Sequence, residues 1–358
     1  MPSLKEIKGR INSISSTLAI TSAMKMVASA KLQKAQMAIQ NMLPYERRLY
    51  SMLLDLMGAM NISAAASEDG SVRGSGSAER GFDQSGDRLS LSNRHDLAGM
   101  DGAYSLMAQR EVRKVAIVAF ASNSSLCGAF NSNVIREATA VINEYRASGL
   151  RDSDIVVYSV GRKMAEAMRK LGFPSPADFT KMSDSPSYEA ASALAQELLD
   201  GFVSGRFDKV ELVYNHYKST SSQPTTRQTY LPLSLADATA DIQVGKITDS
   251  ASESDTNRGA EPVGVPVVRQ GSPTTEDLIV EPSKEALIAT LLPKVIRLRI
   301  FTTLLDSAAA EHAARTVAMQ LATDNGNDLL QELTLEYNKG RQQKITSEIL
   351  DLVGGSMQ

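Results

Sequence analysis

The side chains that could carry out chemistry are few and widely spaced. The three histidines, His95, His216 and His312, do not have the spacing of a metal site. Cys127 follows a predicted strand, where a nucleophile could lie, but a thiolate needs a base or a helix N-terminus to lower its pKa. A helix starting near Asn131 could supply the dipole, and nothing supplies the base. We therefore favour a small buried residue at a tight turn over a reactive thiol.

Nucleotide-binding motifs are equally scarce. The P-loop pattern G-x-x-x-x-G-K-[ST] does not occur. The stretch "GSGSAERG" has two glycines in dinucleotide-like spacing, but it lies in a Gly- and Ser-rich tract and follows no strand. The sequence therefore predicts no catalytic residue, no metal ligand and no cofactor. A small-molecule enzyme is one alternative, and it predicts a pocket with a bound ligand.

Composition narrows the class of protein. The chain has 358 residues, of which 42% are apolar and 22% charged, with a formal net charge of −3, so nucleic acid is not the expected partner. A single cysteine cannot form an internal disulfide, which fits a reducing compartment. No apolar run of about 18 residues is present to span a membrane, and the N-terminus lacks a signal peptide's apolar region. Any membrane association is expected through partners.

The elements that must position these residues begin with a long helix. Over residues 1–60, apolar positions recur in alternating steps of three and four, starting at Leu4 and Ile7 and running to Leu56 and Met60. Sustained heptads of this kind are typical of a coiled coil. At about 1.5 Å per residue the helix would be roughly 85 Å long. Pro44 predicts a kink or a break near Leu43.

The middle of the chain alternates between low-complexity and α/β patterns. Residues 61–110 are rich in Gly, Ser and Asp and predict a disordered insertion. Residues 111–233 alternate apolar strand patterns with amphipathic helices, which predicts an α/β domain with a largely parallel, Rossmann-like sheet. Its strands are expected at 112–120, 154–161, 207–219 and 227–234. Residues 234–275 are acidic and contain prolines, so they predict a second flexible insertion.

A second long helix is predicted within residues 276–358. Ser283 is a plausible N-cap, and near-heptad spacing continues to about Val353, a length of roughly 105 Å. A group of alanines would let another helix approach closely: Ala308, Ala309, Ala310, Ala313 and Ala314. We predict an α/β plus coiled-coil fold, in which the two terminal helices form an antiparallel coiled coil and the α/β domain is inserted between them.

Basic residues are concentrated in the first helix. Residues 1–50 hold eight bases against Glu6 and Glu46, and a basic face indicates an acidic partner surface or a solvated helix face. Lys25 lies on the heptad seam, where a cation weakens a two-helix contact, so we expect it to face another chain. The bases are Lys5, Lys8, Arg10, Lys25, Lys31, Lys34, Arg47 and Arg48.

Three segments together resemble the gamma subunit of the F-type ATP synthase. They are the N-terminal helix with "AMKMVASAK", residues 281–356 ending in "ITSEILDLVGGS", and the loop "SNSSLCGAFN" after the first strand. In the last motif Asn123 stands at a usual Asp and Ser125 at a usual Gly. The resemblance is strong over residues 1–60 and 276–356, moderate over 111–233, and absent from the two insertions.

The resemblance implies a non-catalytic rotor that couples proton translocation to ATP synthesis and hydrolysis. Its partners would be three alpha and three beta subunits, the epsilon subunit and the membrane c-ring, with membrane contact only through these partners. Its place would be the cytoplasmic face of a bacterial inner membrane. The alternative from another class is a coiled-coil scaffold with an inserted α/β domain, which predicts a homodimer.

The resemblance also implies which residues contact partners. Six positions match shaft residues that touch the alpha/beta ring: Met24, Lys25, Arg315, Arg341, Gln342 and Thr346. Lys31 and Lys34 are further candidates, for contact with acidic loops of the beta subunit. For each residue the alternative is an ordinary solvated or seam position.

Overall fold

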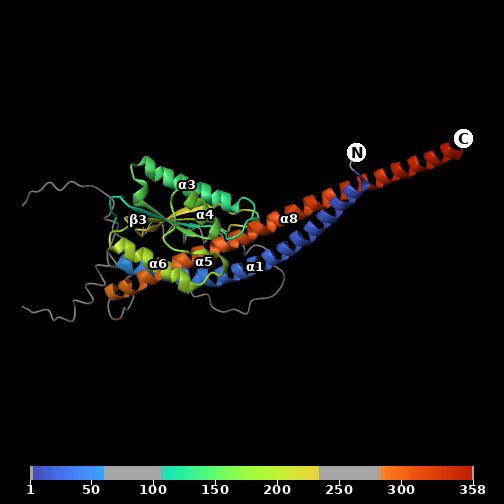
Figure 1. Cartoon of the computed structure of the whole chain (residues 1–358). Coiled ribbons are helices and arrows are strands. Elements are labelled where there is room, and N and C mark those ends of the chain that lie inside the picture. The colour runs from blue at the N-terminus through green and yellow to red at the C-terminus, as the bar shows by residue number, and fades with distance from the viewer. Residues whose placement is uncertain (1–2, 60–105, 108, 234–280, 282–283, 357–358) are drawn as a thin grey trace, which may run out of the picture.

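Two long helices form the axis of the molecule, and a four-stranded sheet lies beside one half of it (Figure 1). The computed structural model describes residues 3–59, 106–107, 109–233, 281 and 284–356. Nearly all of both predicted insertions, and the predicted N-cap Ser283, lie outside the described residues.

The helices α1 (Leu4–Ala59) and α8 (Lys284–Ser356) run antiparallel. Their register follows from contacts along the whole pair. Leu4 lies against Gly340, and Thr323 donates a hydrogen bond to Thr21 at 3.2 Å. At the other end of the pair, Thr302 donates to Glu46 at 3.1 Å. The two residue numbers of each contact add to nearly the same total, as an antiparallel register requires.

Small residues bring the two helices together. Leu32 packs with Ala309 and Ala313 in a buried cluster, and Ala310 packs with Cys127 and Phe130 in another. Because alanine adds only one carbon beyond the backbone, a neighbouring element can approach closely. The prediction that alanines let another helix approach is confirmed for Ala309 and Ala313, whereas Ala310 contacts the α/β domain. Further along, a Cβ added at Gly326 would lie 2.6 Å from Cδ2 of Leu18, so this glycine also sits under a close contact.

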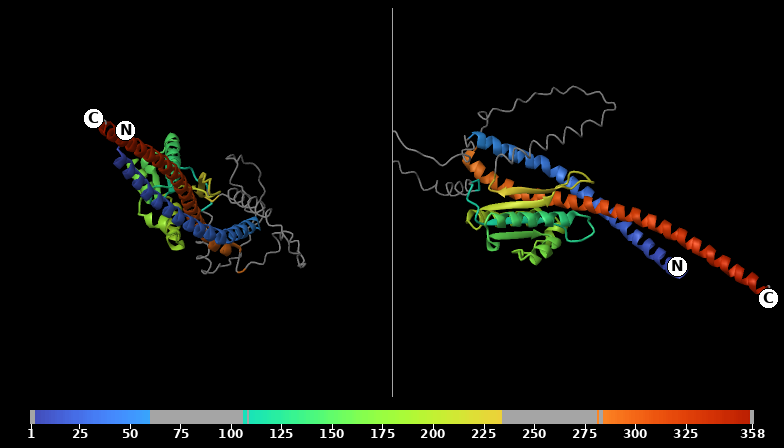
Figure 2. Two further views of the ribbon diagram at one scale, coloured as in Figure 1. Left: turned by 90° about the vertical axis from the view of Figure 1, so that its right-hand side faces the viewer. Right: turned by 90° about the horizontal axis from the view of Figure 1, so that it is seen from above.

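The sequence predicts a kink or a break near Leu43, and the break does not occur. The helix α1 is continuous from Leu4 to Ala59 with Pro44 inside it, and Figure 2 shows it curving gradually toward its C-terminal part. Proline removes one backbone donor and strains the preceding turn. Leu49, Leu53 and Leu56 are buried just beyond it in the main core, so tertiary packing holds the chain helical past the proline.

The sheet is mixed, with strand order β2-β1-β3-β4. β1 pairs in parallel with β2 and β3, while β4 pairs antiparallel with β3. The predicted, largely parallel sheet is confirmed. The strands are β1 (Val115–Phe120), β2 (Ile155–Val160), β3 (Lys209–Asn215) and β4 (Thr225–Leu231).

Helices cover both faces of the sheet. Along β1 the side chains alternate: Val115 and Ile117 pack toward α3 and α4, whereas Ala116 and Val118 pack toward α6 and the long helices. The helices are α3 (Phe130–Ala147), α4 (Arg162–Lys170), α6 (Tyr188–Val203) and the short α5 (Thr180–Asp184). Five residues are too few to show a helical period, so the sequence did not predict α5.

A buried charged network ties the edge strand to its neighbours. Glu211 of β3 is 1% exposed and accepts hydrogen bonds from Arg227 at 2.7 Å and from the hydroxyl of Tyr145 at 2.6 Å. Lys209 lies 2.7 Å from the same carboxylate. Burial raises the pKa of Glu211, but the hydrogen bonds from Arg227, Lys209 and Tyr145 outweigh it and leave that pKa below its usual value. The network joins β3, β4 and α3.

The last part of the predicted first insertion belongs to the core. Leu106 is 4% exposed, and its carbonyl accepts a hydrogen bond from the Leu233 amide at 3.0 Å. The guanidinium of Arg110 donates to the Phe202 carbonyl at 3.1 Å and stacks 4.9 Å from the Phe202 ring. The predicted insertion 61–110 therefore extends too far, because Leu106 bonds to Leu233, just past β4, and Arg110 bonds to Phe202.

We predict that Gly161→Ala destabilises the protein strongly. Gly161 has φ +96°, and an added Cβ would lie 2.0 Å from the Ala121 carbonyl oxygen, so both the conformation and the space require glycine. Urea unfolding should show a loss of more than about 3 kcal/mol.

Gly172→Ala is the matched control. Its φ is +92°, and an added Cβ meets nothing within 4 Å, so it should cost only about 1 kcal/mol. Equal losses for the two variants would contradict this account of Gly161.

Candidate partner-binding surfaces of the helix pair

The place where an α/β sheet usually holds a ligand is filled by α8. In such sheets ligands bind beyond the carboxyl ends of the strands, where the strand order reverses, which here lies between β1 and β3. Cys127 and Phe130, which follow β1, pack there against Ala310 of α8. The amide of Tyr217, just after β3, donates to Oδ1 of Asp306 on α8 at 2.8 Å. The long helix occupies this crevice as a structural neighbour.

Cys127 is part of that packing. It is 1% exposed, and Nδ2 of Asn131 lies 3.1 Å from its sulfur. A reactive thiol needs access to solvent or substrate. The interpretation of Cys127 as a small buried residue at a turn is therefore confirmed.

The loop after β1 accommodates both of its unusual residues. Oδ1 of Asn123 accepts the Arg162 amide at 2.8 Å, and its Nδ2 donates to the Thr180 carbonyl at 2.7 Å. The positive φ angles of this loop fall at Leu126 and Gly128, not at Ser125. Ser125 therefore needs no glycine-like freedom, and its carbonyl is left to accept a hydrogen bond from α8.

That hydrogen bond comes from Arg315, one of the predicted ring-contact residues. Arg315 donates to the Ser125 carbonyl at 2.8 Å and to Glu311 at 2.6 Å, and its side chain is 16% exposed. Its guanidinium is thus committed within the chain. Arg315 fastens the loop after β1 to the long helix.

The groups around Arg315 titrate abnormally. Burial raises the pKa of Glu311, and Arg315 opposes that rise only in part. Burial lowers the pKa of His312 to about 4, helped by the positive charges of Lys31 and Arg315. Lys31 is itself exposed on α1. It adds positive potential both to this buried cluster and to the adjacent surface.

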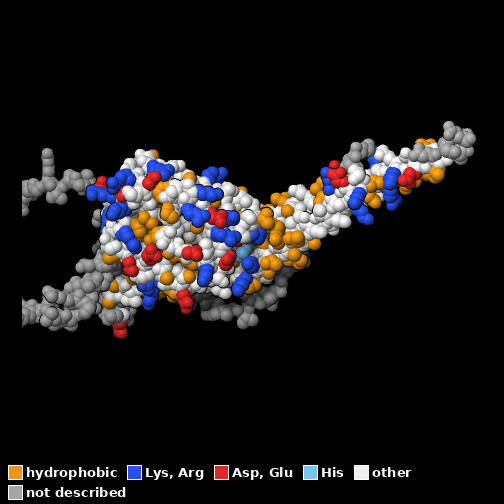
Figure 3. Space-filling view, viewed as in Figure 1, with side chains coloured by type: hydrophobic (Ala, Val, Ile, Leu, Met, Phe, Trp, Pro, Cys, Tyr) orange, Lys and Arg blue, Asp and Glu red, His pale blue; other side chains and the backbone are white. Residues whose placement is uncertain are grey.

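Apolar side chains lie on the surface of the same part of the shaft. Met24 is 42% exposed, Lys25 is half-buried, and Lys34 is exposed. From Ile7 to Tyr45 α1 contains no acidic residue. Figure 3 shows hydrophobic side chains gathered where the shaft leaves the sheet. The exposed apolar residues of this region are Ile20, Met24, Met26, Val27 and Leu321.

The other three predicted contact residues lie on α8 beyond its partner helix. Since Leu4 lies against Gly340, the helix continues from there to Ser356 without α1 beside it, over about 24 Å. Residues 341–350 are all exposed, and they include Arg341, Gln342 and Thr346. The structure therefore divides the predicted residues into a group beside the domain and a group on this tip. Along α8, Arg341 lies about 39 Å from Arg315.

The tip also carries exposed apolar residues outside the predicted contact set. Five large apolar side chains are between 46% and 74% exposed. Their spacing of four and then three or four residues places most of them along one side of the helix. Within the described part of the tip, the ion pair is Lys344–Glu348, at 3.7 Å and solvent-exposed. The apolar residues are Ile345, Ile349, Leu350, Leu352 and Val353.

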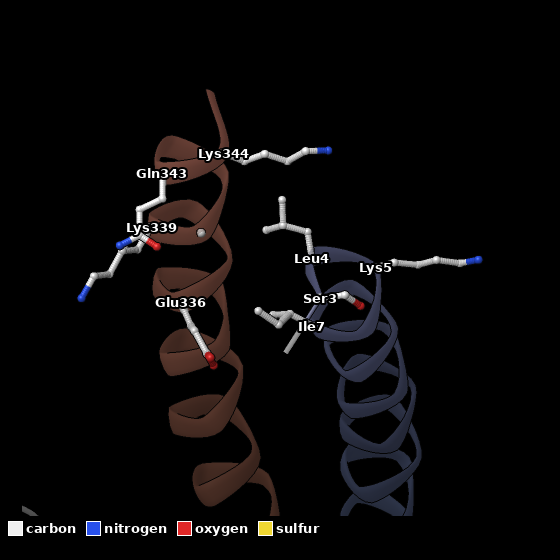
Figure 4. A pocket seen from close by; sticks show the side chains of 9 residues that line it. Ser3, Leu4, Lys5, Ile7, Glu336, Lys339, Gln343 and Lys344 are labelled. Atoms are coloured by element: carbon white, nitrogen blue, oxygen red, sulfur yellow. The ribbon is translucent and has the colours of Figure 1, made fainter. Parts of the chain in front are cut away.

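A notch separates the helices where the pair ends. Its volume is about 600 Å³, and Figure 4 shows Leu4 and Ile7 directed toward α8, Lys5 pointing away from it, and Lys344 extending from α8 above Leu4. The side of the notch formed by α1 is apolar at Leu4 and Ile7, and the side formed by α8 carries Glu336, Gln343 and lysines. The end of the helix pair is therefore asymmetric, because α1 and α8 present different side chains there.

Comparison with known proteins identifies relatives over the whole chain. A sequence model described as "ATP synthase" matches residues 3–357. A curated protein from Phocaeicola vulgatus named "ATP synthase gamma chain" is 47% identical over 357 residues, covering 100% of both chains. A protein of the same name from Bacteroides thetaiotaomicron is 45% identical over 358 residues, also covering 100% of both.

Solved structures share the fold. The rotor of the Euglena gracilis mitochondrial ATP synthase in rotational state 1 matches with a TM-score of 0.51 at 19% identity, covering 96% of this chain and 98% of that chain. A chain from the same enzyme's OSCP/F1/c-ring structure in rotational state 3 matches with a TM-score of 0.52 at 18% identity, covering 99% and 93%.

We predict that protonation of His312 destabilises the chain in acid. Its folded pKa is about 4 and its ordinary value is 6.5, so between these pH values the unfolded chain binds a proton that the folded chain does not. Stability therefore rises with pH across this window and is lost as the pH falls through it. Allowing for partial solvent access, the difference is about 2 kcal/mol.

The measurement compares the wild type with His312→Gln by urea unfolding at pH 7 and pH 4.5. The difference in unfolding free energy between the two proteins, compared at the two pH values, separates the effect of His312 from that of the carboxylates. A difference that stays constant with pH would show that His312 is not buried in its neutral form.

Proposed function

The chain belongs to the ATP synthase gamma-chain family, and from this we propose how its parts act in the central stalk. It is the non-catalytic central-stalk rotor subunit, which couples proton translocation to ATP synthesis and hydrolysis. The observation that carries the proposal is the shape of the shaft. It is a long antiparallel helix pair with a domain at one end and a single-helix tip at the other.

The proposed arrangement follows from what a rotor must do. Its tip projects into the ring of three alpha and three beta subunits, and its α/β domain lies at the membrane end with the epsilon subunit and the c-ring. Two helices packed along their length resist bending more than one. Because α1 and α8 end at different heights and expose different residues, each beta subunit meets a different face as the shaft turns.

We assign the finer architecture in the same way. The pair α1–α8 is a coiled coil, supported by its heptad positions and constant register, and the α/β unit is Rossmann-like, supported by parallel strands covered on both faces. The proposed divisions are 1–60, 61–110, 111–233, 234–275 and 276–358. Leu106 and Arg110 lie within the second division, although both are held in the folded domain.

We assign the partner contacts to two levels of the shaft. Arg341, Gln342 and Thr346 meet the alpha/beta ring at the tip, where their side chains are exposed. Met24 and Lys25 meet the ring nearer the α/β domain, and Lys31 and Lys34 face acidic loops of the beta subunits. Arg315 acts mainly through the loop that it holds, because its guanidinium is bound within the chain.

The membrane connection is assigned to the partners. Within the described residues, no helix is both long and apolar enough to cross a bilayer. Curated relatives come from Phocaeicola vulgatus and Bacteroides thetaiotaomicron. We therefore place the complex on the cytoplasmic face of a bacterial inner membrane.

Co-expression with the alpha and beta subunits of its own organism tests the assignment. We expect a stable complex of three alpha, three beta and one copy of this chain, with ATPase activity. Deletion of 351–358 should preserve assembly, since the ring contacts at Arg341 and Gln342 remain, and should lower turnover. A chain that instead purified as a homodimer and never joined the complex would support the scaffold alternative and contradict the rotor.

Two arginine variants separate partner contact from internal support. Arg341→Ala should change the chain's own stability by less than about 0.5 kcal/mol, because the residue is exposed, yet it should lower the ATPase activity of the complex. Arg315→Ala should destabilise the isolated chain by about 2–3 kcal/mol, because it leaves Glu311 buried without its partner. Urea unfolding of each chain and ATPase assays of each complex check this. An equal loss of stability in both variants would contradict the assignment.

A further inference from the structure

One acidic residue of the shaft is bonded twice to the α/β domain. Oδ2 of Asp306 lies 2.6 Å from Nδ1 of His216, and Oδ1 accepts the Tyr217 amide at 2.8 Å. Asp306 is on α8, whereas His216 and Tyr217 directly follow β3. The Asp306 side chain is 16% exposed. Both oxygens of one short side chain therefore hold the domain to the shaft.

Tyr217 extends this connection to the other long helix. Its hydroxyl accepts a hydrogen bond from Nε2 of Gln36 on α1 at 2.6 Å. Its side chain packs against the seam cluster of Leu32, Ala309 and Ala313, and also against the cluster that contains Cys127. The segment after β3 is thus wedged between α1, α8 and the loop after β1. We call this junction, formed by Gln36, His216, Tyr217 and Asp306, the shoulder.

The shoulder differs from the attachment at the other end of the domain, where α1 ends and α8 begins. There the main core joins α1, α6, α8 and the sheet through a large set of apolar residues. At the shoulder, each of the two clusters has only three buried members. Apolar contacts are non-directional, whereas charge-assisted hydrogen bonds fix geometry. Directional bonds therefore carry a larger share of the attachment at the shoulder.

We propose that Asp306 is a positioning residue for energy coupling, which locks the α/β domain to the shaft so that torque on one turns the other. The proposal rests on the rotor function. A load that twists the domain about the shaft axis pulls sideways on their contacts. The main core resists separation, and the Asp306 bonds resist sliding. Without them the domain would yield before the shaft turned, and proton flow would be less tightly linked to ATP turnover.

The test uses the whole membrane complex with Asp306→Ala. We expect the ATPase activity of the detached catalytic part to stay close to that of the wild type, because the tip is unchanged. ATP-driven proton pumping in inverted vesicles, divided by ATP hydrolysed, should fall severalfold. Amide exchange at Tyr217 in the complex should speed up about tenfold, because its acceptor is gone.

Two further variants keep the result interpretable. Asp306→Asn keeps an acceptor for the Tyr217 amide and loses the charge that faces His216. It should therefore lose less pumping per ATP than Asp306→Ala, and it carries the test if Asp306→Ala does not assemble. Asp200→Ala removes another acid of the domain, whose side chain accepts a bond from Gln196 of its own helix, and pumping per ATP should not change.

The outcomes separate the two proposals. A wild-type chain that does not assemble with alpha and beta subunits would overturn the rotor function itself. A coupled wild-type complex with unchanged pumping per ATP in both Asp306 variants would overturn the role of Asp306 alone. Equal losses of hydrolysis and pumping would also overturn it, because they would indicate a general structural defect.

Discussion

The close antiparallel packing of α1 against α8 is the constraint on which the rest of the structure depends. It is set by small residues, with Ala309 and Ala313 beneath Leu32 and Gly326 beneath Leu18. These contacts fix the register, and the register fixes how far α8 extends past Leu4. A shift by one turn would move the exposed tip by about 5.4 Å and change which side chains it presents.

The same packing decides what the α/β domain can do. In this chain α8 lies across the strand ends where comparable sheets bind ligands, and Ala310 and Asp306 make contacts there. The α/β domain therefore binds and supports the shaft at the place where a ligand would otherwise bind. Its edge strand is secured by the buried Glu211 and its partners, and its loop after β1 is secured by Arg315. The domain and the shaft share one continuous core.

Much of this was predictable from local pattern. Heptad spacing gave both long helices, and β-branched runs gave the parallel strands, because these patterns depend only on which residues avoid water. The path through Pro44 was not predictable, since packing by Leu53 and its neighbours overrides a local penalty. Leu106 was assigned to an insertion because its surroundings in sequence are polar, while its partner Leu233 is far along the chain.

The predicted contact residues show the same limit. Their identities came from resemblance to a family, and sequence could not show that Arg315 is bound internally while Arg341 is exposed. The apolar spacing of Ile345 and Ile349 was visible, but their exposure depends on where α1 ends. The shoulder at Asp306 was invisible, since its bonds join residues about 90 positions apart.

Direct observation of rotation would decide whether the helix pair acts as a rotor. A probe attached through Ala140→Cys, an exposed position on α3, would report the motion of the α/β domain in a surface-held complex with alpha and beta subunits. The native Cys127 is buried and should not compete for the label. If the chain is the rotor, the probe should rotate stepwise in one direction and only when ATP is present. A complex that hydrolyses ATP while the probe stays still would contradict the rotor function.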